Sequence, residues 1–311
     1  MNGFLETWHR WCAVSSALRF VDVNLRGTGQ VMFQNNPVTG ALFLAAIAWG
    51  SVAGGAPEVL IGGLLGLVSA TLTALWLRVD QEGLAAGLYG YNGILVGLAL
   101  PTFLPPSALL WSYVVLGAGV SVVAMLGTVN VTRTWRVSAL TFPFVLTTWV
   151  LLLAAFAFAG LGGGVPSFSA DIEPLAPGAS DPLDLAGFLS GILKSISQVF
   201  LKGNGVSALL LLAGLAVGSV PAAMFAVGGA VLAVSSAHLF GAESALISAE
   251  QIDRKSVVAY AALGTLFTVV VQAAMNVAFA PLGIPALTAP FVLTSWLFLL
   301  PQQHLSSDAN H

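Results

Sequence analysis

The chain has 311 residues, of which 57% are hydrophobic and only 7% are charged, with a formal net charge of −3. Soluble domains carry about 25% charged residues, so this composition excludes a soluble monomer and predicts a protein embedded in a lipid bilayer. The small negative charge also excludes the basic surface that nucleic acids bind, and no nucleic-acid partner is expected.

Apolar stretches follow one another along the whole chain. About 20 apolar residues span a bilayer, and a helix satisfies its own backbone there, so each stretch is predicted to be helical. The first set lies near residues 11–25, 38–54, 59–77, 84–104, 107–131 and 141–160, and the second near 186–201, 206–219, 221–237, 238–249, 256–280 and 286–300. Segments 28–36 and 196–204 are too polar and too short to span, and we expect broken or re-entrant elements that line a path.

The chain therefore divides into two membrane halves. We expect a first repeat at residues 1–160, an acidic linker rich in Gly, Pro and Ser at 161–185, a second repeat at 186–301 and a C-terminal tail at 302–311. Two arginines, Arg133 and Arg136, place the connection around them in the cytoplasm by the positive-inside rule. Five full crossings per half would give the halves opposite orientations and cytoplasmic termini, whereas six would give a parallel repeat unless one is half-spanning.

One segment of eleven residues occurs twice, at 139–149 and at 286–296, and only two of the eleven pairs differ. Thr141 pairs with Thr288 at an offset of 147, since 288 − 141 = 147. Transporters built from two such halves place the solute path at the interface between the repeats. We therefore expect one central pore in the chain, close to these two threonines.

Shorter blocks repeat with other offsets. Gln30 pairs with Gln198 at an offset of 168, and the block 88–90 pairs with the block 239–241 at an offset of 151. Since 168 − 151 = 17, the second half has lost about 17 residues between these two blocks.

The repeated polar residues favour a neutral solute that forms hydrogen bonds. Thr141 and Thr288 offer hydroxyls, and Gln30 and Gln198 offer amides. All of these groups must find partners in an apolar path. No matched pair of charges recurs between the halves, so coupling to an ion or proton is not indicated. A narrow, flat constriction beside the polar groups is predicted from three apolar and aromatic residues, Phe33, Tyr91 and Leu95.

Each candidate also has a purely structural interpretation. A threonine in a membrane helix often bonds its own helix or joins two helices, and a glutamine can join helices too. Tyr91 alone is more typical of packing, and Trp149 and Trp296 are interpreted as interfacial or packing aromatics without a site role. His238 and Glu243 are ionisable residues in an apolar stretch, which makes them either functional candidates or residues near a membrane interface.

Motifs for catalysis and metal binding are absent from the sequence. It contains no Walker loop and no H-E-x-x-H, C-x-x-C or G-x-S-x-G motif, and its four histidines do not have metal-ligand spacing. We therefore expect neither an enzyme nor a protein that needs a metal or cofactor.

Three groups of motifs resemble the urea transporter family. Phe20-Val21-Asp22, Leu25-Arg26-Gly27 and the segment 30–40 resemble its first signature, and 87–93 with 95–97 resembles its second. The paired Leu-Thr-x-Pro-Phe segments resemble its LPxxTxPF motif. The resemblance covers most of 20–160 and is patchier in 186–301.

The resemblance implies an all-α integral membrane protein with two inverted repeats of about five transmembrane helices each, plus re-entrant half-helices. It implies a homotrimer in the bacterial inner membrane, with one pore per protomer that conducts urea passively. Urea would pass a narrow slot between apolar and aromatic residues, where a ladder of oxygens accepts its N–H groups. Carried over by motif position, the residues lining this path would be Gln30, Phe33, Tyr91, Leu95 and Thr141 in the first half and Gln198, Leu201, Leu246 and Thr288 in the second.

The second half departs from the family pattern at two residues beside the expected slot. Ala242 stands where an aromatic residue is expected, which would widen the slot, and Glu243 replaces an amide with a carboxylate. These changes keep two alternatives open. One is a channel for a related small solute such as a short amide, ammonia or water. The other is a membrane protein that does not conduct.

Overall fold

The computed structural model describes residues 2–158, 161, 185–201, 203–241 and 256–300. All regular elements in this part of the chain are helices, which confirms the predicted all-α class. Most of the expected linker, the tail from residue 301, and the candidates Ala242, Glu243 and Leu246 lie outside the described residues. The side chain of His238 lies outside them too, although its backbone belongs to a described helix.

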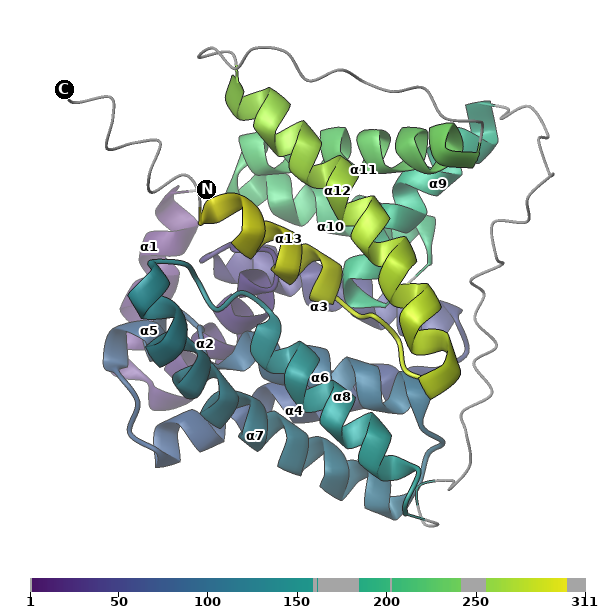
Figure 1. The fold of residues 1–311 in the computed structure, drawn as a ribbon. Coiled ribbons are helices and arrows are strands. Elements are labelled where there is room, and N and C mark those ends of the chain that lie inside the picture. Colours follow the sequence, from purple (N-terminus) through teal and green to yellow (C-terminus); the bar gives the residue numbers. More distant parts are fainter. Residues whose placement is uncertain (1, 159–160, 162–184, 202, 242–255, 301–311) are drawn as a thin grey trace.

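The first half forms the lower part of the molecule in Figure 1. Its helices are α1 (Asn2–Val14), α2 (Ser16–Gln30), α3 (Pro37–Ala53), α4 (Pro57–Trp76), α5 (Gln81–Ala85), α6 (Gly90–Phe103), α7 (Ala108–Thr132), the 3₁₀ turn η1 (Arg133–Trp135) and α8 (Phe142–Ala155). The second half forms the upper part. It contains α9 (Leu185–Ser197), η3 (Gln198–Phe200), α10 (Gly205–Gly218), α11 (Val220–Gly241), α12 (Ser256–Phe279), η4 (Ala280–Leu282) and α13 (Ala289–Leu299).

Three predicted stretches were wrong in their boundaries. The stretch 11–25 is broken at Ser15, whose side chain caps α2 by accepting the backbone N–H of Leu18. The stretch 84–104 is divided into α5 and α6 by a turn at Gly87, where φ is +77° and an added Cβ would lie 2.3 Å from the nitrogen of Gly27. The predicted boundary at 237/238 is absent, because α11 continues to Gly241.

The two polar segments do interrupt helices, as predicted. In the first half α2 ends at Gln30 and α3 begins at Pro37. In the second half the helix pair 188–200 and 205–218 is bent by 72°. Each break is followed by an asparagine that caps the next helix, because such a side chain satisfies the first free N–H groups. Asn36 accepts from residues 38 and 39, and Asn204 accepts from 206 and 207, again at an offset of 168.

Several apolar helices are long enough to cross a bilayer. Among the described residues these are Pro57–Trp76, Ala108–Trp135 and Tyr260–Leu282, with the bent pair as a fourth if it is counted as one span. Four more apolar helices are shorter, namely Pro37–Ala53, Phe142–Ala155, Val220–Ser235 and Ala289–Leu299. Together they make a multi-pass membrane protein. Ten crossings would require the shorter helices to count as spans or parts of spans.

Left-handed backbone conformations recur at the offsets of the sequence repeat. Outside glycine such conformations are uncommon, because the Cβ atom crowds the backbone. Six residues form three pairs with nearly equal φ, and the pairs are Phe33 (58°) with Leu201 (56°), Arg136 (53°) with Gly283 (61°), and Leu140 (51°) with Leu287 (54°). The offsets are 168, 147 and 147. The two halves therefore share turn geometry as well as sequence.

Helices α3 and α10 exchange equivalent hydrogen bonds. The Thr39 hydroxyl donates to the carbonyl of Gly214 at 2.8 Å, and the Ser207 hydroxyl donates to the carbonyl of Ala46 at 2.8 Å. Both donors and both acceptors are related by the same offset, since 207 − 39 = 168 and 214 − 46 = 168. Early positions on each helix meet later positions on the other, so the helices run antiparallel. Such reciprocal pairing is what a two-fold axis between them produces.

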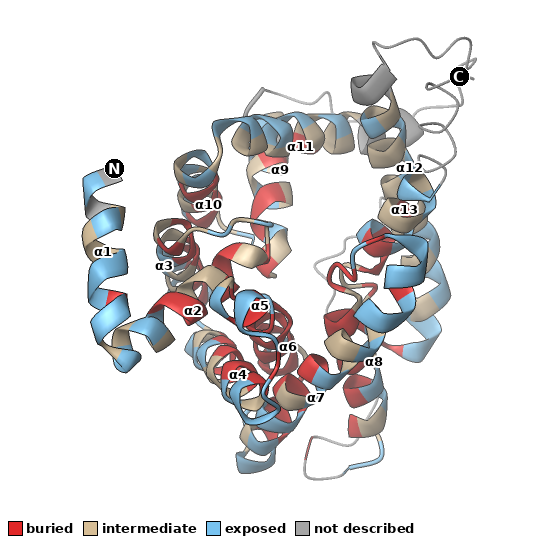
Figure 2. Ribbon diagram, turned by 90° about the vertical axis from the view of Figure 1, so that its left-hand side faces the viewer, coloured by how far each residue is buried: buried red, intermediate tan, exposed pale blue. Residues whose placement is uncertain are grey.

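The core of the first half is built around α6. Every residue from Gly90 to Pro101 is buried, and the buried residues in Figure 2 gather on α6 and its neighbours while α1 is largely exposed. Glycines let α4 and α6 approach closely, with Gly62 and Gly66 on α4 facing Gly93 and Gly97 on α6. These pairs have the G-x-x-x-G spacing that brings membrane helices into backbone contact.

The close approach predicts a strong effect of one methyl group. In Gly97→Ala the new Cβ would lie 2.1 Å from the carbonyl oxygen of Gly62, which is backbone and cannot rotate away. We expect a loss of about 1–3 kcal/mol, the usual cost of overpacking, measured as a lower unfolding temperature of the purified protein in detergent. Gly127→Ala on α7 is the matched control, since nothing lies within 4 Å of its added Cβ, and it should be neutral or stabilising. Equal destabilisation by both changes would contradict this packing.

Candidate functional site

The two duplicated threonines meet in the structure. The Oγ1 atoms of Thr141 and Thr288 lie 2.8 Å apart, at hydrogen-bond distance, although 147 residues separate them. Thr141 is the N-cap residue of α8 and Thr288 that of α13, with φ of −90° and −92°, and neither hydroxyl caps its own helix. Thr141 is only 3% exposed. The contact fits both roles that the sequence leaves open, joining two helices and lining a path between them.

Each threonine follows a turn that the local sequence makes irregular. Leu140 and Leu287 adopt left-handed conformations, and a proline stands two residues after each threonine, at Pro143 and Pro290. Proline is tolerated there because the first N–H groups of a helix have no partner inside it. In the first half, Asn92 adds its side-chain oxygen as an acceptor for the N–H of Phe144 at 3.2 Å. The threonines therefore sit on fixed helix starts.

Two tryptophans connect the halves on either side of the threonine pair. The indole N–H of Trp149 donates to the carbonyl of Pro285 at 2.9 Å, and that of Trp296 donates to the carbonyl of Ser138 at 2.8 Å. The two donors are related by the offset of 147, since 296 − 149 = 147, and so are the two acceptors, since 285 − 138 = 147. The interpretation of these side chains as having no site role missed these bonds. The available signal was that a buried indole N–H needs an acceptor and that both copies are retained.

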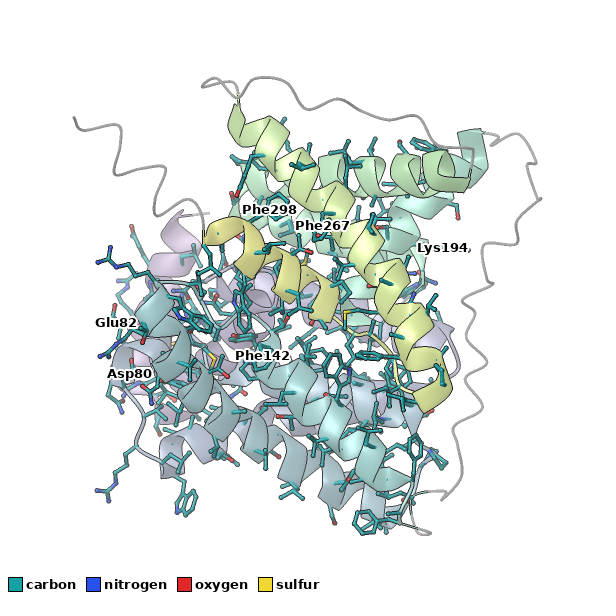
Figure 3. The ribbon with its side chains drawn as sticks, in the orientation of Figure 1. Asp80, Glu82, Phe142, Lys194, Phe267 and Phe298 are labelled. Atoms are coloured by element: carbon teal, nitrogen blue, oxygen red, sulfur yellow. The ribbon has the colours of Figure 1, made fainter. Side chains whose placement is uncertain are left out.

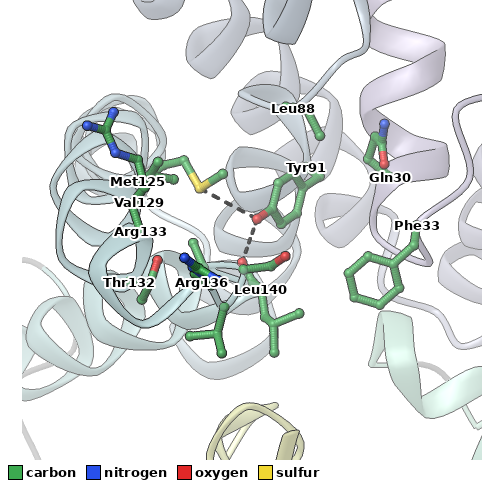
Figure 4. Close-up of a pocket in the computed structure, with 13 residues that line it drawn as sticks. Gln30, Phe33, Leu88, Tyr91, Met125, Val129, Thr132, Arg133, Arg136 and Leu140 are labelled. Carbon is green, nitrogen blue, oxygen red and sulfur yellow. Dashed lines mark hydrogen bonds between the residues drawn. The ribbon is translucent and has the colours of Figure 1, made fainter. Parts of the chain in front are cut away.

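A cavity of about 490 Å³ opens on the first-half side of the threonine pair (Figure 4). It contains three predicted path residues, Gln30, Phe33 and Tyr91, and it reaches Leu140, the neighbour of Thr141. Tyr91 donates its hydroxyl to the carbonyl of Leu140 at 2.5 Å, as Figure 4 shows. The other lining residues are Leu88, Met125, Val129, Thr132, Arg133, Arg136, Val137, Ser138 and Ala139.

The remaining candidates are placed elsewhere. Leu95 is 1% exposed and belongs to the packed core, and it does not line this cavity. Gln198 is exposed, and Leu201 is partly buried in the left-handed conformation that it shares with Phe33. The structure therefore groups four of the described candidates near the cavity and the threonine pair in the first half, and Thr288 alone joins them from the second.

Gln30 is held by a connection that the second half lacks at the corresponding place. Its amide nitrogen donates to the carbonyl of Ala86 at 2.9 Å, at the end of α5. This contact uses one amide N–H and leaves the side-chain oxygen to accept. In the second half α10 and α11 are separated by a single residue, and α11 then continues to Gly241 without a short helix like α5. The 17 residues missing from the second half thus correspond to the region of α5.

Asp80 stabilises the α5 connection that holds Gln30. Its carboxylate accepts the backbone N–H of Gly83 at 2.6 Å and the hydroxyl of Tyr89. Figure 3 places Asp80 at the outer edge of the molecule, away from Phe142 in the middle. The hydrogen bond from Tyr89, followed by that from Gly83, lowers the pKa of Asp80 below its ordinary value. Its stabilisation is therefore complete above the ordinary carboxylate pKa and is lost only as the pH falls through the lowered value.

The charge around the cavity is positive. Arg133 and Arg136 line it, and no acidic side chain is among the described residues that line it. Within the described ranges, no group of three or more His, Cys, Asp or Glu side chains is arranged to hold a metal ion. The cavity can therefore offer carbonyl, amide and hydroxyl groups to a neutral solute, while its guanidinium groups repel small cations.

Comparison with known proteins places the chain in a family. The family model described as "Urea transporter" matches residues 21–251 and 244–303. Urea transporter 1 of Ovis aries is 27% identical over 322 residues, covering 96% of this chain and 82% of its own length. Urea transporter 1 of Capra hircus is 27% identical over 325 residues, with the same coverage. Urea transporter 1 of Rattus norvegicus is 40% identical over 94 residues, covering 30% of this chain and 23% of its own length.

This multi-pass helical membrane protein is a transporter and not an enzyme. The chain belongs to the urea transporter family, which confirms the resemblance of its sequence motifs.

Four buried hydroxyls find no hydrogen-bond partner among the described residues, on Ser51, Thr147, Thr148 and Thr294. Thr147 and Thr294 are equivalent in the repeat, since 294 − 147 = 147. Most other threonines in these helices, such as Thr73 and Thr128, donate to the carbonyl four residues earlier. An unpaired buried hydroxyl costs free energy. Substitutions at these positions therefore test whether each hydroxyl binds water or a solute.

We expect Thr148→Val and Thr71→Val to have opposite effects on stability. Both side chains are buried, at 0% and 1% exposure. The Thr71 hydroxyl donates to the side-chain oxygen of Asn24 at 3.0 Å, so its loss should cost about 1–3 kcal/mol. The Thr148 hydroxyl has no partner among the described residues, so its removal should be neutral or stabilising. Thermal unfolding in detergent measures both, and equal losses would show that Thr148 has a bound partner such as water.

Proposed function

We propose that this protein conducts urea passively across the membrane, through a pore that passes between two inverted repeats at the Thr141–Thr288 pair. The observation that carries the proposal is that each half makes the same hydrogen bonds to the other half around that pair. Equivalent hydrogen bonds run in both directions between α3 and α10, and between each of α8 and α13 and the turn that precedes the other. In both pairs, early positions of one half meet late positions of the other, as inverted halves require.

The chemistry of the threonine pair suits a planar diamide. Urea donates four N–H groups and accepts at one oxygen, and each threonine hydroxyl can donate once and accept twice. With their oxygens 2.8 Å apart, the hydroxyls leave no space for a solute between them, so conduction requires them to separate. The solute then replaces the hydrogen bond that the pair loses. An exchange of one neutral hydrogen bond for another is nearly balanced, which favours passage without tight binding.

The mouth of the proposed pore adds an acceptor and selects against cations. The anchored amide of Gln30 lines the cavity, and its oxygen can accept an N–H group of urea there. Arg133 and Arg136 raise the electrostatic energy of a cation such as ammonium in the same cavity. Among the described residues, no acidic side chain lines this cavity to offset them. Neutral urea is therefore favoured over a charged relative.

The assembly and its placement are also proposals. We propose a homotrimer in the bacterial inner membrane, with one pore per protomer and cytoplasmic termini, as the family resemblance implies. Several long apolar side chains on the outer faces of α4 and α7 are exposed in the single chain and suit lipid or a neighbouring protomer, among them Leu64, Leu72, Val115, Leu116 and Val120.

A channel for a related neutral solute is the second candidate. Two observations favour it. The side chain of Gln198 is exposed and forms no hydrogen bond to another described residue, and the described part of the second half has no counterpart of α5 to anchor it. A path with one ordered mouth and one less constrained mouth discriminates less by shape, so acetamide and water are the solutes to compare with urea.

Stopped-flow urea efflux from proteoliposomes tests the proposed function. We expect efflux well above that of empty liposomes, and a fall in Thr141→Val/Thr288→Val on the order of 5–100-fold, since the two hydroxyls together contribute about 1–3 kcal/mol to a path with no other partner. Thr73→Val is the matched control, because its hydroxyl bonds the carbonyl of Ser69 in its own helix, and its efflux should stay near normal. Wild-type efflux equal to that of empty liposomes, from a folded protein, would overturn the proposal.

Gln30→Ala provides a separate test of the mouth. Loss of the side chain removes the acceptor in the cavity and the contact with Ala86. We expect urea efflux to fall severalfold while the oligomeric state in size-exclusion chromatography stays unchanged. The control is Gln81→Ala, whose amide lies beside the same connection and only approaches the carbonyl of Val79 at 3.5 Å. Normal efflux in Gln30→Ala would identify Gln30 as a residue that only joins helices.

A further inference from the structure

We propose that Trp149 and Trp296 are positioning residues for the solute path. Each indole belongs to one half and holds the turn of the other half that carries a threonine hydroxyl. The inference rests on the proposed pore between Thr141 and Thr288. It adds that the spacing of the two hydroxyls, and with it the choice of solute, is set by these two tryptophans.

The turns before the threonines need an external partner. Each contains two left-handed residues, at 136 and 140 in the first half and at 283 and 287 in the second. Such turns cannot satisfy their carbonyls by helical hydrogen bonds, and an unpaired carbonyl in a membrane interior costs several kcal/mol. The carbonyls of Ser138 and Pro285 are met by side chains from the opposite half. The conformation of each turn therefore depends on the other half.

The geometry places the two indole bonds on either side of the threonine contact. Each tryptophan lies eight residues after the threonine of its own half, since 149 − 141 = 8 and 296 − 288 = 8. Eight helical residues rise about 12 Å. Three hydrogen bonds thus join the halves in a row, and the outer two hold the turns against which the central threonines are aligned.

Ring packing makes the two tryptophans unequal. The ring of Trp296 lies 5.1 Å from that of Phe142, the residue directly after Thr141. Phe142 occupies one of the two differing pairs of the duplicated segment, and its equivalent is Ala289. Trp149 packs instead on Phe279, at 5.0 Å and an angle of 88°, ahead of the Thr288 turn. Trp296 therefore holds the Thr141 turn by a hydrogen bond and by a ring, and its loss should displace Thr141 more.

The ratio between the fluxes of two solutes separates a positioning role from a merely structural one, because a loss of folded protein leaves this ratio unchanged. Lower folding yield reduces the flux of every solute by the same factor, whereas displaced hydroxyls change the ratio of solutes. We expect Trp149→Phe and Trp296→Phe, which keep a six-membered aromatic ring and lose the five-membered ring with its N–H, to lower the ratio of urea flux to N-methylurea flux by a factor of about three to ten, as expected for one weakened hydrogen bond. The larger change should occur in Trp296→Leu, which removes both the indole N–H and the ring that packs on Phe142.

The chain offers matched controls for these variants. Trp76 is 80% exposed and Trp49 is 52% exposed, and neither indole N–H donates to another described residue. Trp76→Phe and Trp49→Phe should leave the ratio of the two fluxes unchanged. Unchanged ratios in Trp149→Phe and Trp296→Phe, with normal wild-type urea flux, would overturn this inference and leave the proposed function intact. Absence of wild-type flux would instead overturn the proposed function.

Cross-linking reports the position of the turns without transport. In a Cys12→Ala background, the double variant Thr141→Cys/Thr288→Cys places two thiols where the hydroxyls now lie 2.8 Å apart. We expect rapid loss of free thiols with a mild oxidant in the monodisperse protein, and slower loss when Trp296→Phe or Trp149→Phe is added. An unchanged rate in both backgrounds would show that the tryptophans do not set the spacing of the pair.

Discussion

The need to satisfy backbone carbonyls inside a membrane is the constraint on which the rest of this structure depends. A helix start on which a threonine faces the partner half requires an irregular turn before it, and that turn leaves carbonyls without helical partners. Here the opposite half supplies the donors, with Trp149 bonding the carbonyl of Pro285 and Trp296 bonding that of Ser138. Neither half can form its threonine turn with all groups satisfied unless the other is present.

The two halves are similar in plan but unequal in packing. Glycines on α4 and α6 bring these helices into backbone contact, and the connection through α5 anchors Gln30. In the described residues the second half has no short helix like α5, since α11 continues unbroken to Gly241, and the span Tyr260–Leu282 has no buried residue in its most apolar window. The first half is therefore the more closely packed of the two. The second contributes its threonine through the exchanged contacts.

Sequence patterns predicted much of this architecture because duplication is visible without coordinates. The paired motifs predicted that Thr141 and Thr288 share an environment, and the polar segments predicted breaks between α2 and α3 and after α9. Leu95 could not be placed in the same way, because its apolar character suits a packed core and a slot wall equally well, and here it lies in the core. Its position depends on how closely the glycines of α4 let α6 approach.

The sequence by itself determined the membrane environment, the helical class, the family and the pairing of residues between halves, since these follow from composition and from repetition. Tertiary structure decided which donors meet which acceptors. An indole N–H or a threonine hydroxyl can bond its own helix, a neighbour or solute, and the choice depends on atoms brought within about 3 Å by helix packing. The 2.8 Å contact of Thr141 with Thr288 and the exchange of Trp149 and Trp296 between the halves are such choices.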